Sequence, residues 1–452
     1  MNNTTQLISS NSYHMIDVIE PMQVKLNINY NPYHFKFDEL FQMAARKNKK
    51  RSFLFVSKVL GKHLPISPAK GLATGLLLAE SYLKDVEGKK LSSSSPFVDV
   101  LKNKQSKFSD TAFIGDQYSP IIIGFAETAT ALGQAFFQAF KNADYFHTTR
   151  EDLLNVESII HFEEEHSHAT SHRCYIDANL LQNSREIILV DDEVTTGKTA
   201  RNIITSLHDK FPRKHYTVVS ILDWRNETNK NAFIELEEAL DITIRHISLL
   251  AGEVEVDGNP VIKEEESVDF YRPSTEMNEI YIEKELPMLF ASKYYPTTNQ
   301  KSPFNTVPYI AESGRFGLDS KVNVLLNSKA EKVATFLDQK RKGKHILCIG
   351  TGEFMYLPMK IASLMEGSVK YQSTTRSPIH VHNKPSYGAR FGMTFPSPEV
   401  EEVVNYIYNI PPETYDEVFI FFERLVDEQV LSKFLQQLKI PSIQVVFLKG
   451  VR

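Results

Sequence analysis

The sequence is poor in cysteine, and its cysteines are not arranged for metal or disulfide chemistry. Cys174 and Cys348 lie far apart and share no metal-type spacing, so neither a cysteine-bound metal nor a disulfide framework is expected. This usage fits a reduced cytoplasm. No apolar run approaches the length that spans a bilayer, and the N-terminus is polar without a hydrophobic signal core. We therefore expect a cytoplasmic protein with no membrane partner.

The chain also lacks a basic excess. It has 51 Lys and Arg against 56 Asp and Glu, a formal net charge of −5. A dedicated nucleic-acid-binding domain usually carries a clear basic excess, so no nucleic-acid partner is expected. One local basic run, residues 46–51, is interpreted as a solvated face before a strand.

At 452 residues the chain is too long for one ordinary domain. The pattern of apolar segments weakens from about 252 to 320, where an Asp257-Gly258 turn, an acidic run and scattered prolines occur. We expect an N-terminal extension at 1–35, a first domain at 36–270, a linker at 271–320 and a second domain at 321–452.

The central section alternates short apolar runs with amphipathic helical segments. Strand-like runs occur at 121–123, 186–190 and 216–222, and the first two precede segments with apolar residues at helical spacing. Such alternation predicts an α/β fold, with a parallel sheet covered by helices on both faces. A second α/β section begins near residue 344.

One motif carries most of the functional information. A buried strand candidate ends in two adjacent carboxylates, Asp191 and Asp192, and a small hydroxyl-rich loop then opens a helix. Carboxylates at the end of a parallel strand can accept hydrogen bonds from the vicinal hydroxyls of a ribose. Backbone N–H groups and hydroxyls at a helix N-terminus favour a phosphate. The loop consists of Thr195, Thr196, Gly197, Lys198 and Thr199.

This motif has two alternative interpretations. A nucleotide-triphosphate P-loop ends in Gly-Lys-Thr, but it needs a glycine five residues before Gly197, where this chain has Asp192. That interpretation fails. An acidic pair that merely caps the next helix would explain Asp192 but not the whole string.

These residues resemble the signature of the type I phosphoribosyltransferases, which bind 5-phosphoribosyl-1-pyrophosphate (PRPP). The match is strong over some thirteen residues, and the surrounding strand–helix order agrees over about 120–225. The resemblance implies a Rossmann-like parallel-sheet domain in which Asp191 and Asp192 hold the ribose hydroxyls. It implies that the Thr195–Thr199 loop cradles the 5′-phosphate, and that Mg²⁺ binds with PRPP, held mainly by the ligand's own oxygens and water.

The same resemblance assigns a role to the turn after residues 121–123. In the family such a turn holds the pyrophosphate through backbone amides, which here implicates Phe125, Ala126, Glu127 and Thr128. The alternative is a simple strand-to-helix connection. Glu127 is unusual in an anion site and is expected to bind a metal or a backbone amide instead.

The family places its mobile catalytic loop between these two motifs, where this chain is rich in histidine and glutamate. Glu163, Glu165, His166 and His168 suit proton transfer to or from an acceptor nitrogen. A metal site from His166, His168 and His172 matches no established spacing, and an ordinary solvated loop is the remaining alternative. No directly ligated metal is predicted.

Asp223 and Trp224 follow the next strand, where family members often contact the base or pyrophosphate. A core role for Trp224, the only tryptophan, is the alternative. The hood that selects the acceptor is expected at 57–63 or within 252–320, and the acceptor itself is not identified.

The C-terminal section resembles a second, eroded copy of the first. Gly124 and Gly350 each follow an apolar run, and both copies place a tyrosine 21 residues after the glycine and a Thr-Thr-Arg string ending 26 residues after it. The later strand, 415–423, is not followed by a Thr-Gly phosphate loop. We expect a duplicated domain that keeps the fold and has lost the PRPP site.

The string Thr374-Thr375-Arg376-Ser377-Pro378 is similar to a narrower group, bacterial phosphoribosyltransferases fused to a C-terminal Thr-Arg-Ser-Pro (TRSP) domain. This group is associated with tellurite-resistance and stress genes and with nucleoside-like metabolites. Glu353 and Arg376 are the candidate C-terminal site residues, since an arginine can bind a phosphate or carboxylate bidentately.

Taken together, the sequence predicts a PRPP-dependent enzyme that transfers phosphoribose to or from a nitrogen acceptor, with pyrophosphate as leaving group. A non-catalytic PRPP sensor or scaffold is the alternative. The expected partners are small molecules, and the fold class often forms homodimers.

Overall fold

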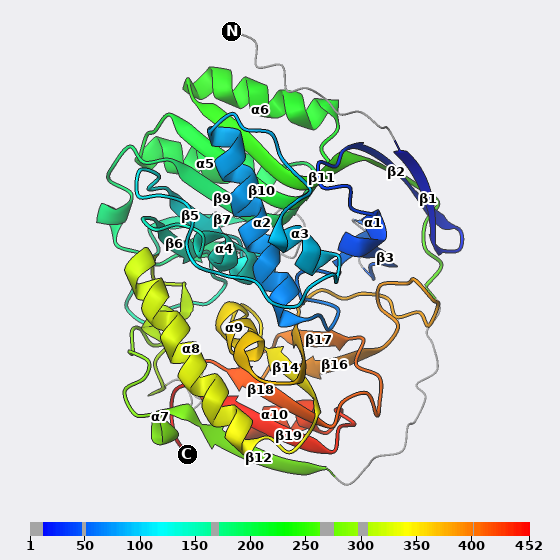
Figure 1. The fold of residues 1–452 in the computed structure, drawn as a ribbon, viewed down its shortest axis with the longest axis vertical. Helices are drawn as coiled ribbons and strands as arrows, with labels where there is room; N and C mark the ends of the chain where they lie inside the picture. The colour runs from blue at the N-terminus through cyan, green and yellow to red at the C-terminus, as the bar shows by residue number, and fades with distance from the viewer. Residues whose placement is uncertain (1–11, 48–50, 164–170, 263–274, 297–305, 401) are drawn as a thin grey trace.

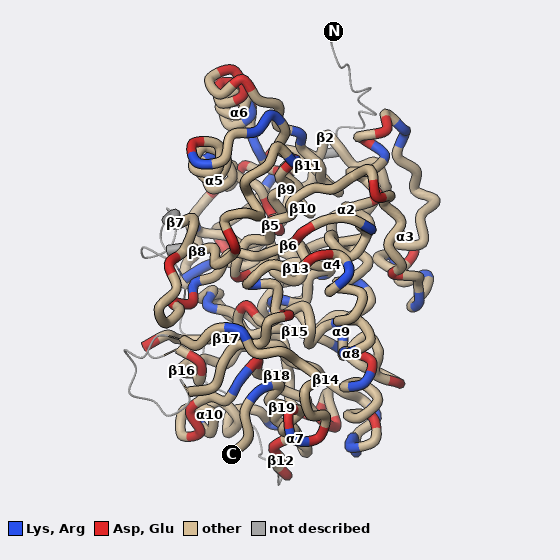
Figure 2. Tube along the Cα trace, turned by 90° about the vertical axis from the view of Figure 1, so that its left-hand side faces the viewer, with Lys and Arg blue, Asp and Glu red and all other residues tan. Residues whose placement is uncertain are grey.

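The computed structural model describes residues 12–47, 51–163, 171–262, 275–296, 306–400 and 402–452. Two sheets lie one beyond the other along the longest axis of the molecule (Figures 1 and 2). The first belongs to the N-terminal part of the chain and the second to the C-terminal part. The α/β class predicted for both parts is confirmed.

The first sheet has a parallel centre with antiparallel additions at both edges. Its inner strands are β11, β10, β9, β5 and β6, all parallel, while β1 and β2 continue one edge and β13 the other in antiparallel pairing. In spatial order the strands are β1 (Ser12–Ile19), β2 (Met22–Tyr30), β11 (Thr243–Asp257), β10 (His215–Asp223), β9 (Ile187–Val194), β5 (Ile121–Gly124), β6 (Asp144–His147) and β13 (Leu318–Asp319).

The second sheet is entirely parallel within the described chain. Its order is β12 (Glu276–Tyr281), β19 (Ser442–Phe447), β18 (Glu417–Phe422), β14 (His345–Gly350) and β15 (Ser368–Ser373). Three small antiparallel pairs complete the strands: β3 (Phe41–Ala45) with β4 (Phe53–Ser57), β7 (Ile160–Glu163) with β8 (Ser171–Cys174), and β16 (Gly392–Pro396) with β17 (Val404–Tyr408).

Helices cover the sheets as the handedness rule requires. The β5–α4–β6 and β9–α5–β10 connections run in opposite directions along the first sheet, so α4 and α5 cover opposite faces. The same holds for α9 and α10 on the second sheet. The helices are α1 (Phe37–Leu40), α2 (Pro68–Val86), α3 (Pro96–Leu101), α4 (Thr130–Phe137), α5 (Lys198–Lys210), α6 (Glu227–Leu240), α7 (Ile282–Glu285), α8 (Ser320–Lys340), α9 (Tyr356–Leu364) and α10 (Glu428–Leu435).

Buried helices join the two parts of the molecule. Helices α2 and α4 of the first part pack against α9 of the second (Figure 1). Leu72 and Ala135 share one apolar cluster with Met359 and Ile361, and a Cβ on Gly71 would collide with the Met359 Sδ. The join thus includes a packed apolar core.

The segments expected to be an extension and a linker contribute strands to both sheets. Strands β1 and β2 form a hairpin on β11, β12 joins the second sheet, and β13 pairs with β6. The alternation of buried and exposed residues along β2 is the sequence signal for its strand.

In the described part of the chain, no helix is long and apolar enough to cross a bilayer. On the side drawn in Figure 2, acidic and basic residues are interleaved rather than sorted into broad single-sign areas.

Candidate functional site

The predicted strand–loop–helix motif is present at the carboxyl end of β9. The four residues 187–190 are fully buried, because β9 lies between β10 and β5, and β9 ends at Val194. Helix α5 begins at Lys198. The loop of residues 195–197 therefore opens at the edge where an α/β sheet binds its ligands.

Gly197 fixes the shape of this loop. Its φ of 67° lies in the left-handed region, and a Cβ there would fall 2.7 Å from Cζ of Phe233. As N-cap of α5 it has no side chain that could bond the first-turn N–H groups. These N–H groups and the helix dipole make the end of α5 suitable for a phosphate.

Acidic side chains gather at the end of β9. Asp191 and Asp192 are partly exposed. Burial, reinforced by the nearby Glu193 carboxylate, raises the pKa of Asp192 to about 6. Glu193 is paired with Arg51 at 2.5 Å, so the last residue of the basic run 46–51 reaches this strand instead of lying only on a solvated face.

We expect Asp192→Asn to stabilise the fold at pH 7.5 by on the order of 2 kcal/mol. The folded protein holds this proton to a pH of about 6, against 3.8 for an ordinary aspartate, so the ionised carboxylate destabilises the fold above pH 6. The gain should shrink as the pH falls through 6 and vanish below about 4. Urea unfolding at pH 7.5 and below pH 4 measures this gain in stability, with the exposed Asp116→Asn as control. An equal gain at the two pH values would contradict the raised pKa of Asp192.

The turn after β5 is shaped by close contacts. A Cβ on Gly124 would fall 2.8 Å from the Tyr145 hydroxyl and 3.0 Å from the Ala129 carbonyl oxygen, so only glycine fits. The Ala126–Glu127 peptide bond is cis. The Ala126 N–H donates to Thr148 Oγ1 at 2.8 Å. The turn begins with Phe125 and Ala126, whose side chains are buried, and it leads into α4.

Three cations surround the buried Glu127 carboxylate. Lys62 pairs with it directly, Arg150 Nη1 lies 3.5 Å from Oε2, and Arg376 Nε lies 3.8 Å from the same oxygen. Burial by itself would raise the pKa of Glu127, but Lys62 and the two guanidinium groups hold it near 2. Glu127 was expected to bind a metal or a backbone amide; its partners here are positively charged side chains.

Most of the expected catalytic loop lies outside the residues that the structure describes. Glu165, His166 and His168 lie outside the described residues, and Glu163 is described only as the last residue of β7. His172, once considered as a metal ligand, is buried with its Nδ1 3.0 Å from Thr148 Oγ1. In the described residues, no cluster of three or more histidine, cysteine or acidic residues is arranged to hold a metal.

The residues after β10 are engaged within the protein. Trp224 is 3% exposed and stacks on Phe55, with ring centroids 5.1 Å apart, in agreement with the core alternative. The Asp223 carboxylate accepts hydrogen bonds from Arg225 Nε at 2.9 Å and Nη2 at 2.7 Å. Their assignment to the base side stays a prediction.

The second sheet repeats the arrangement of the first. Strand β14 lies between β15 and β18 as β5 lies between β6 and β9, and Gly350 is the counterpart of Gly124. A Cβ on Gly350 would fall 2.8 Å from the Tyr371 hydroxyl, the same distance that separates a Cβ on Gly124 from the Tyr145 hydroxyl.

The turns that follow the two glycines are held by matching hydrogen bonds. The Ala126 N–H donates to Thr148 Oγ1 at 2.8 Å, and the Gly352 N–H donates to Thr374 Oγ1 at 2.9 Å. Shared topology, shared steric limits and shared hydrogen bonds together support the predicted duplication.

The second copy has not kept a phosphate loop. Helix α10 follows β18, but its N-cap Asp427 accepts a hydrogen bond from the Val430 N–H at 2.9 Å. A carboxylate at this position occupies the place where an anion would bind at the end of α5. The Asp427 cap is compatible with the expectation that the second copy has no phosphate site.

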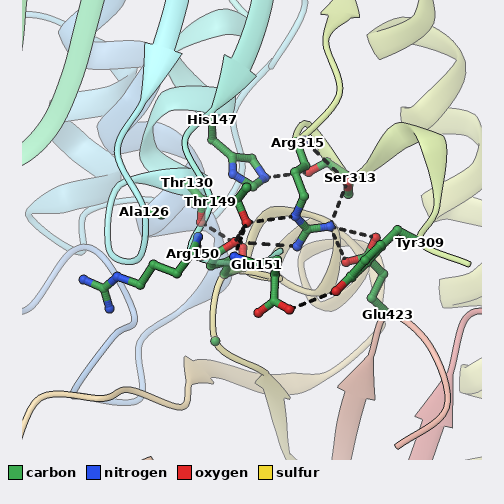
Figure 3. Close-up of polar contacts among 12 residues, drawn as sticks. Ala126, Thr130, His147, Thr149, Arg150, Glu151, Tyr309, Ser313, Arg315 and Glu423 are labelled. Atoms are coloured by element: carbon green, nitrogen blue, oxygen red, sulfur yellow. Dashed lines mark hydrogen bonds and ion pairs between the residues drawn. The ribbon is translucent and has the colours of Figure 1, made fainter. Parts of the chain in front are cut away.

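A buried arginine ties the two copies together at their facing edges (Figure 3). Arg315 Nε donates to Thr149 Oγ1 at 3.2 Å, and its Nη1 donates to both oxygens of Glu423 at 3.2 and 3.0 Å. Its Nη2 lies 3.7 Å from Glu353, and the guanidinium stacks over Tyr309 at 4.5 Å. Burial would lower the pKa of Arg315, but the two carboxylates raise it, so the side chain stays charged.

A small pocket opens beside this network. It lies at the carboxyl ends of β14 and β18, where the chain connections of the second sheet diverge. Both candidate C-terminal site residues, Glu353 and Arg376, line it. The second copy thus retains a pocket at its topological switch point, the usual ligand position in such sheets.

Several residues that shape the site were not identified from the sequence. These residues come from three separate segments, and each reaches its partner only in the folded chain: Lys62 contacts Glu127, Thr148 contacts Ala126, and Arg315 contacts Thr149. For Thr148 a signal existed, because it begins the Thr-Thr-Arg string that the second copy repeats. Lys62 lies in the segment 57–63 expected as a hood, and Arg315 lies in a Gly-Arg-Phe-Gly string similar to the TRSP domain, but neither pattern indicates which residue it contacts.

Two family models match the chain. Residues 40–253 match a family described as phosphoribosyl transferase, and residues 312–438 match the TRSP domain, described as C-terminal to that transferase domain. No curated protein sequence matches the chain.

Solved structures give distant likenesses. An adenine phosphoribosyl transferase from Trypanosoma brucei is 10% identical, with 52% of this chain and 86% of that chain covered and a TM-score of 0.31. The corresponding enzyme from Leishmania tarentolae is 16% identical, with coverages of 48% and 85% and a TM-score of 0.27. A hypoxanthine phosphoribosyltransferase from Staphylococcus aureus is 10% identical, with coverages of 37% and 69% and a TM-score of 0.18. The assignment of the domains rests on the family models.

Proposed function

We propose that this phosphoribosyltransferase, a transferase domain followed by a TRSP domain, moves a 5-phosphoribosyl group between PRPP and a nitrogen acceptor, with pyrophosphate as the other product or substrate. The observation that carries the proposal is the end of β9. There two partly exposed carboxylates stand beside a glycine loop and a helix N-terminus without a side-chain cap.

We assign each part of PRPP to a separate part of this arrangement. We assign the ribose hydroxyls to Asp191 and Asp192, and the 5′-phosphate to Thr195, Thr196, Gly197, Lys198 and Thr199. The turn after β5, with Phe125, Ala126, Glu127 and Thr128, is assigned to the pyrophosphate. Since the transition state is oxocarbenium-like, the protein acts by holding sugar, phosphate and leaving group in place and excluding water.

Magnesium fits this donor set as a companion of the ligand. The carboxylates at the end of β9 are hard oxygen donors, and Mg²⁺ commonly combines one or two carboxylates with phosphate oxygens and water. Asp191 and Asp192 are the residues that would face it. Bound there, the ion would neutralise charge on the pyrophosphate.

Proton transfer at the acceptor is assigned to the loop between β7 and β8. We propose that Glu163, Glu165, His166 and His168 supply this function, since their side chains suit proton exchange near neutral pH. Asp223 and Trp224 are proposed to lie on the base side. The resemblance of the TRSP string further leads us to propose a nucleoside-like product linked to stress and tellurite resistance.

A PRPP-sensing or scaffold protein is the alternative function. It is favoured by the pocket at the carboxyl ends of β14 and β18, which lies where the two domains meet. A ligand bound there would contact residues of both domains and so couple binding to their arrangement. A sensor needs the phosphate loop but needs no proton-transfer groups.

Release of pyrophosphate from Mg–PRPP in the presence of a panel of nucleobases and amines separates the two functions. We expect turnover by the wild type, and a loss of at least a hundredfold in the Asp191→Asn, Asp192→Asn variant. Alanine at all four proposed loop residues should lower kcat by about a hundredfold while PRPP still binds. PRPP binding by the wild type without turnover on any acceptor would favour the sensor, and unchanged kcat in the loop variant would remove its catalytic role.

A further inference from the structure

The side chain of Arg376 crosses from the second domain to the pyrophosphate turn of the first. Arg376 follows β15, yet its Nε lies 3.8 Å from Oε2 of Glu127 and its Nη2 lies 3.8 Å from Oε1 of Glu151. Among the residues that the structure describes, its guanidinium forms no hydrogen bond, and the side chain is 24% exposed. Its two carboxylate neighbours thus lie at ion-pair distance rather than hydrogen-bond distance, which leaves N–H groups that can donate to an incoming ligand.

Three cationic side chains approach the single carboxylate of Glu127, while Glu151 approaches Arg376 from another side. Lys62, Arg150 and Arg376 all lie within 4 Å of one carboxylate. Burial lowers the pKa of Lys62, Glu127 raises it, and the two guanidinium groups lower it, because the three cations repel one another across the turn. A polyanion bound at this turn would relieve that repulsion, whereas a neutral ligand would not.

The duplication explains how two arginines reach the same carboxylate. Arg150 and Arg376 stand at matching positions, each 26 residues after the glycine of its own copy. The two copies face each other at these edges, and Glu353, the counterpart of Glu127, accepts the Arg150 backbone N–H at 2.6 Å. The second domain therefore both supplies one arginine and fixes the backbone of the other.

We propose that the second domain completes the pyrophosphate end of the transferase site, with Arg376 as a binding residue for the pyrophosphate group. This inference rests on the proposed function. Guanidinium groups bind phosphate oxygens bidentately. The second domain has no phosphate loop of its own, because Asp427 caps α10, so Arg376 serves the first domain's turn.

Calorimetric titration of the full-length protein with magnesium and inorganic pyrophosphate, and separately with ribose 5-phosphate, tests the proposal. We expect Arg376→Gln to weaken pyrophosphate binding about tenfold or more and to leave ribose 5-phosphate binding unchanged. Arg376→Lys, which keeps the charge but not the fork of donors, should show an intermediate loss. The matched control is Arg390→Gln, an exposed arginine bonded only to Asn383 through its side chain, which should alter neither affinity.

The outcomes separate this inference from the proposed function. If Arg376→Gln binds pyrophosphate as tightly as the wild type does while both bind ribose 5-phosphate, the role of Arg376 is refuted and the transferase site stands. If Arg376→Gln loses both ligands and melts at a lower temperature while Arg376→Lys keeps full affinity for both, Arg376 is an interdomain contact only. If the wild type binds no ribose 5-phosphate, the proposed function itself fails, and this inference with it.

Discussion

Replacing Arg315 with methionine is expected to lower the free energy of unfolding by about 3–5 kcal/mol. The guanidinium is 4% exposed and neutralises Glu423 and Glu353, which are equally buried. Without it, two buried carboxylates would lose their main counter-charge. The loss should be larger than that of any exposed ion pair, because exposed pairs are screened by water and contribute about 0–1 kcal/mol.

Urea unfolding of Arg315→Met measures this loss, and two further variants sharpen it. Arg390→Met, on the surface, should change the stability by less than about 0.5 kcal/mol. Adding Glu423→Gln to Arg315→Met should recover part of the loss, because it removes one unpaired charge. A loss below about 1 kcal/mol in Arg315→Met would show that the Arg315 network does not hold the two domains together.

Replacing Gly197 with alanine is expected to lower the affinity for ribose 5-phosphate at least tenfold and the stability by about 1–3 kcal/mol. The residue has a φ of 67°, and an added Cβ would collide with the Phe233 ring, at 2.7 Å from its Cζ and closer still to its Cε2. The loop has to shift to relieve that contact, and its N–H groups would then no longer converge on the phosphate.

Gly88→Ala is a matched control for this prediction. Gly88 has a φ of 65°, but a Cβ there meets nothing within 4 Å. Gly88→Ala should therefore lower the free energy of unfolding only by the backbone strain, about 1–2 kcal/mol, and should leave ligand binding unchanged. Equal ribose 5-phosphate affinity in wild type and Gly197→Ala would contradict the assignment of the loop.

Local sequence patterns predicted the central fold well, because the burial of each strand and helix determines which of its residues are apolar. The run at 187–190 is apolar on both faces since β9 is covered by helices on both sides, and a parallel sheet follows from that pattern. The glycine and the two carboxylates at its end identified the loop, because few other residues suit that conformation and that chemistry. The repeated Thr-Thr-Arg string likewise predicted the second copy.

The sequence could not predict which distant residues meet. The ion pairs of Glu127 join residues 62, 150 and 376, which lie on three segments and two domains. The edge strand β12 was also missed, because it joins the second sheet next to β19, the last strand of the chain. Such contacts depend on how the two copies face each other, and local periodicity holds no information about that packing.

The central claim is that the end of β9 binds PRPP, and calorimetric titration of Mg–PRPP into wild type and the Asp191→Asn, Asp192→Asn variant tests it most directly. The account predicts saturable binding by the wild type and at least a hundredfold weaker binding by the variant. The variant should stay folded, since removing the Asp192 charge is expected to stabilise the protein. Equal affinity of the two proteins, or no binding by the wild type, would contradict the account.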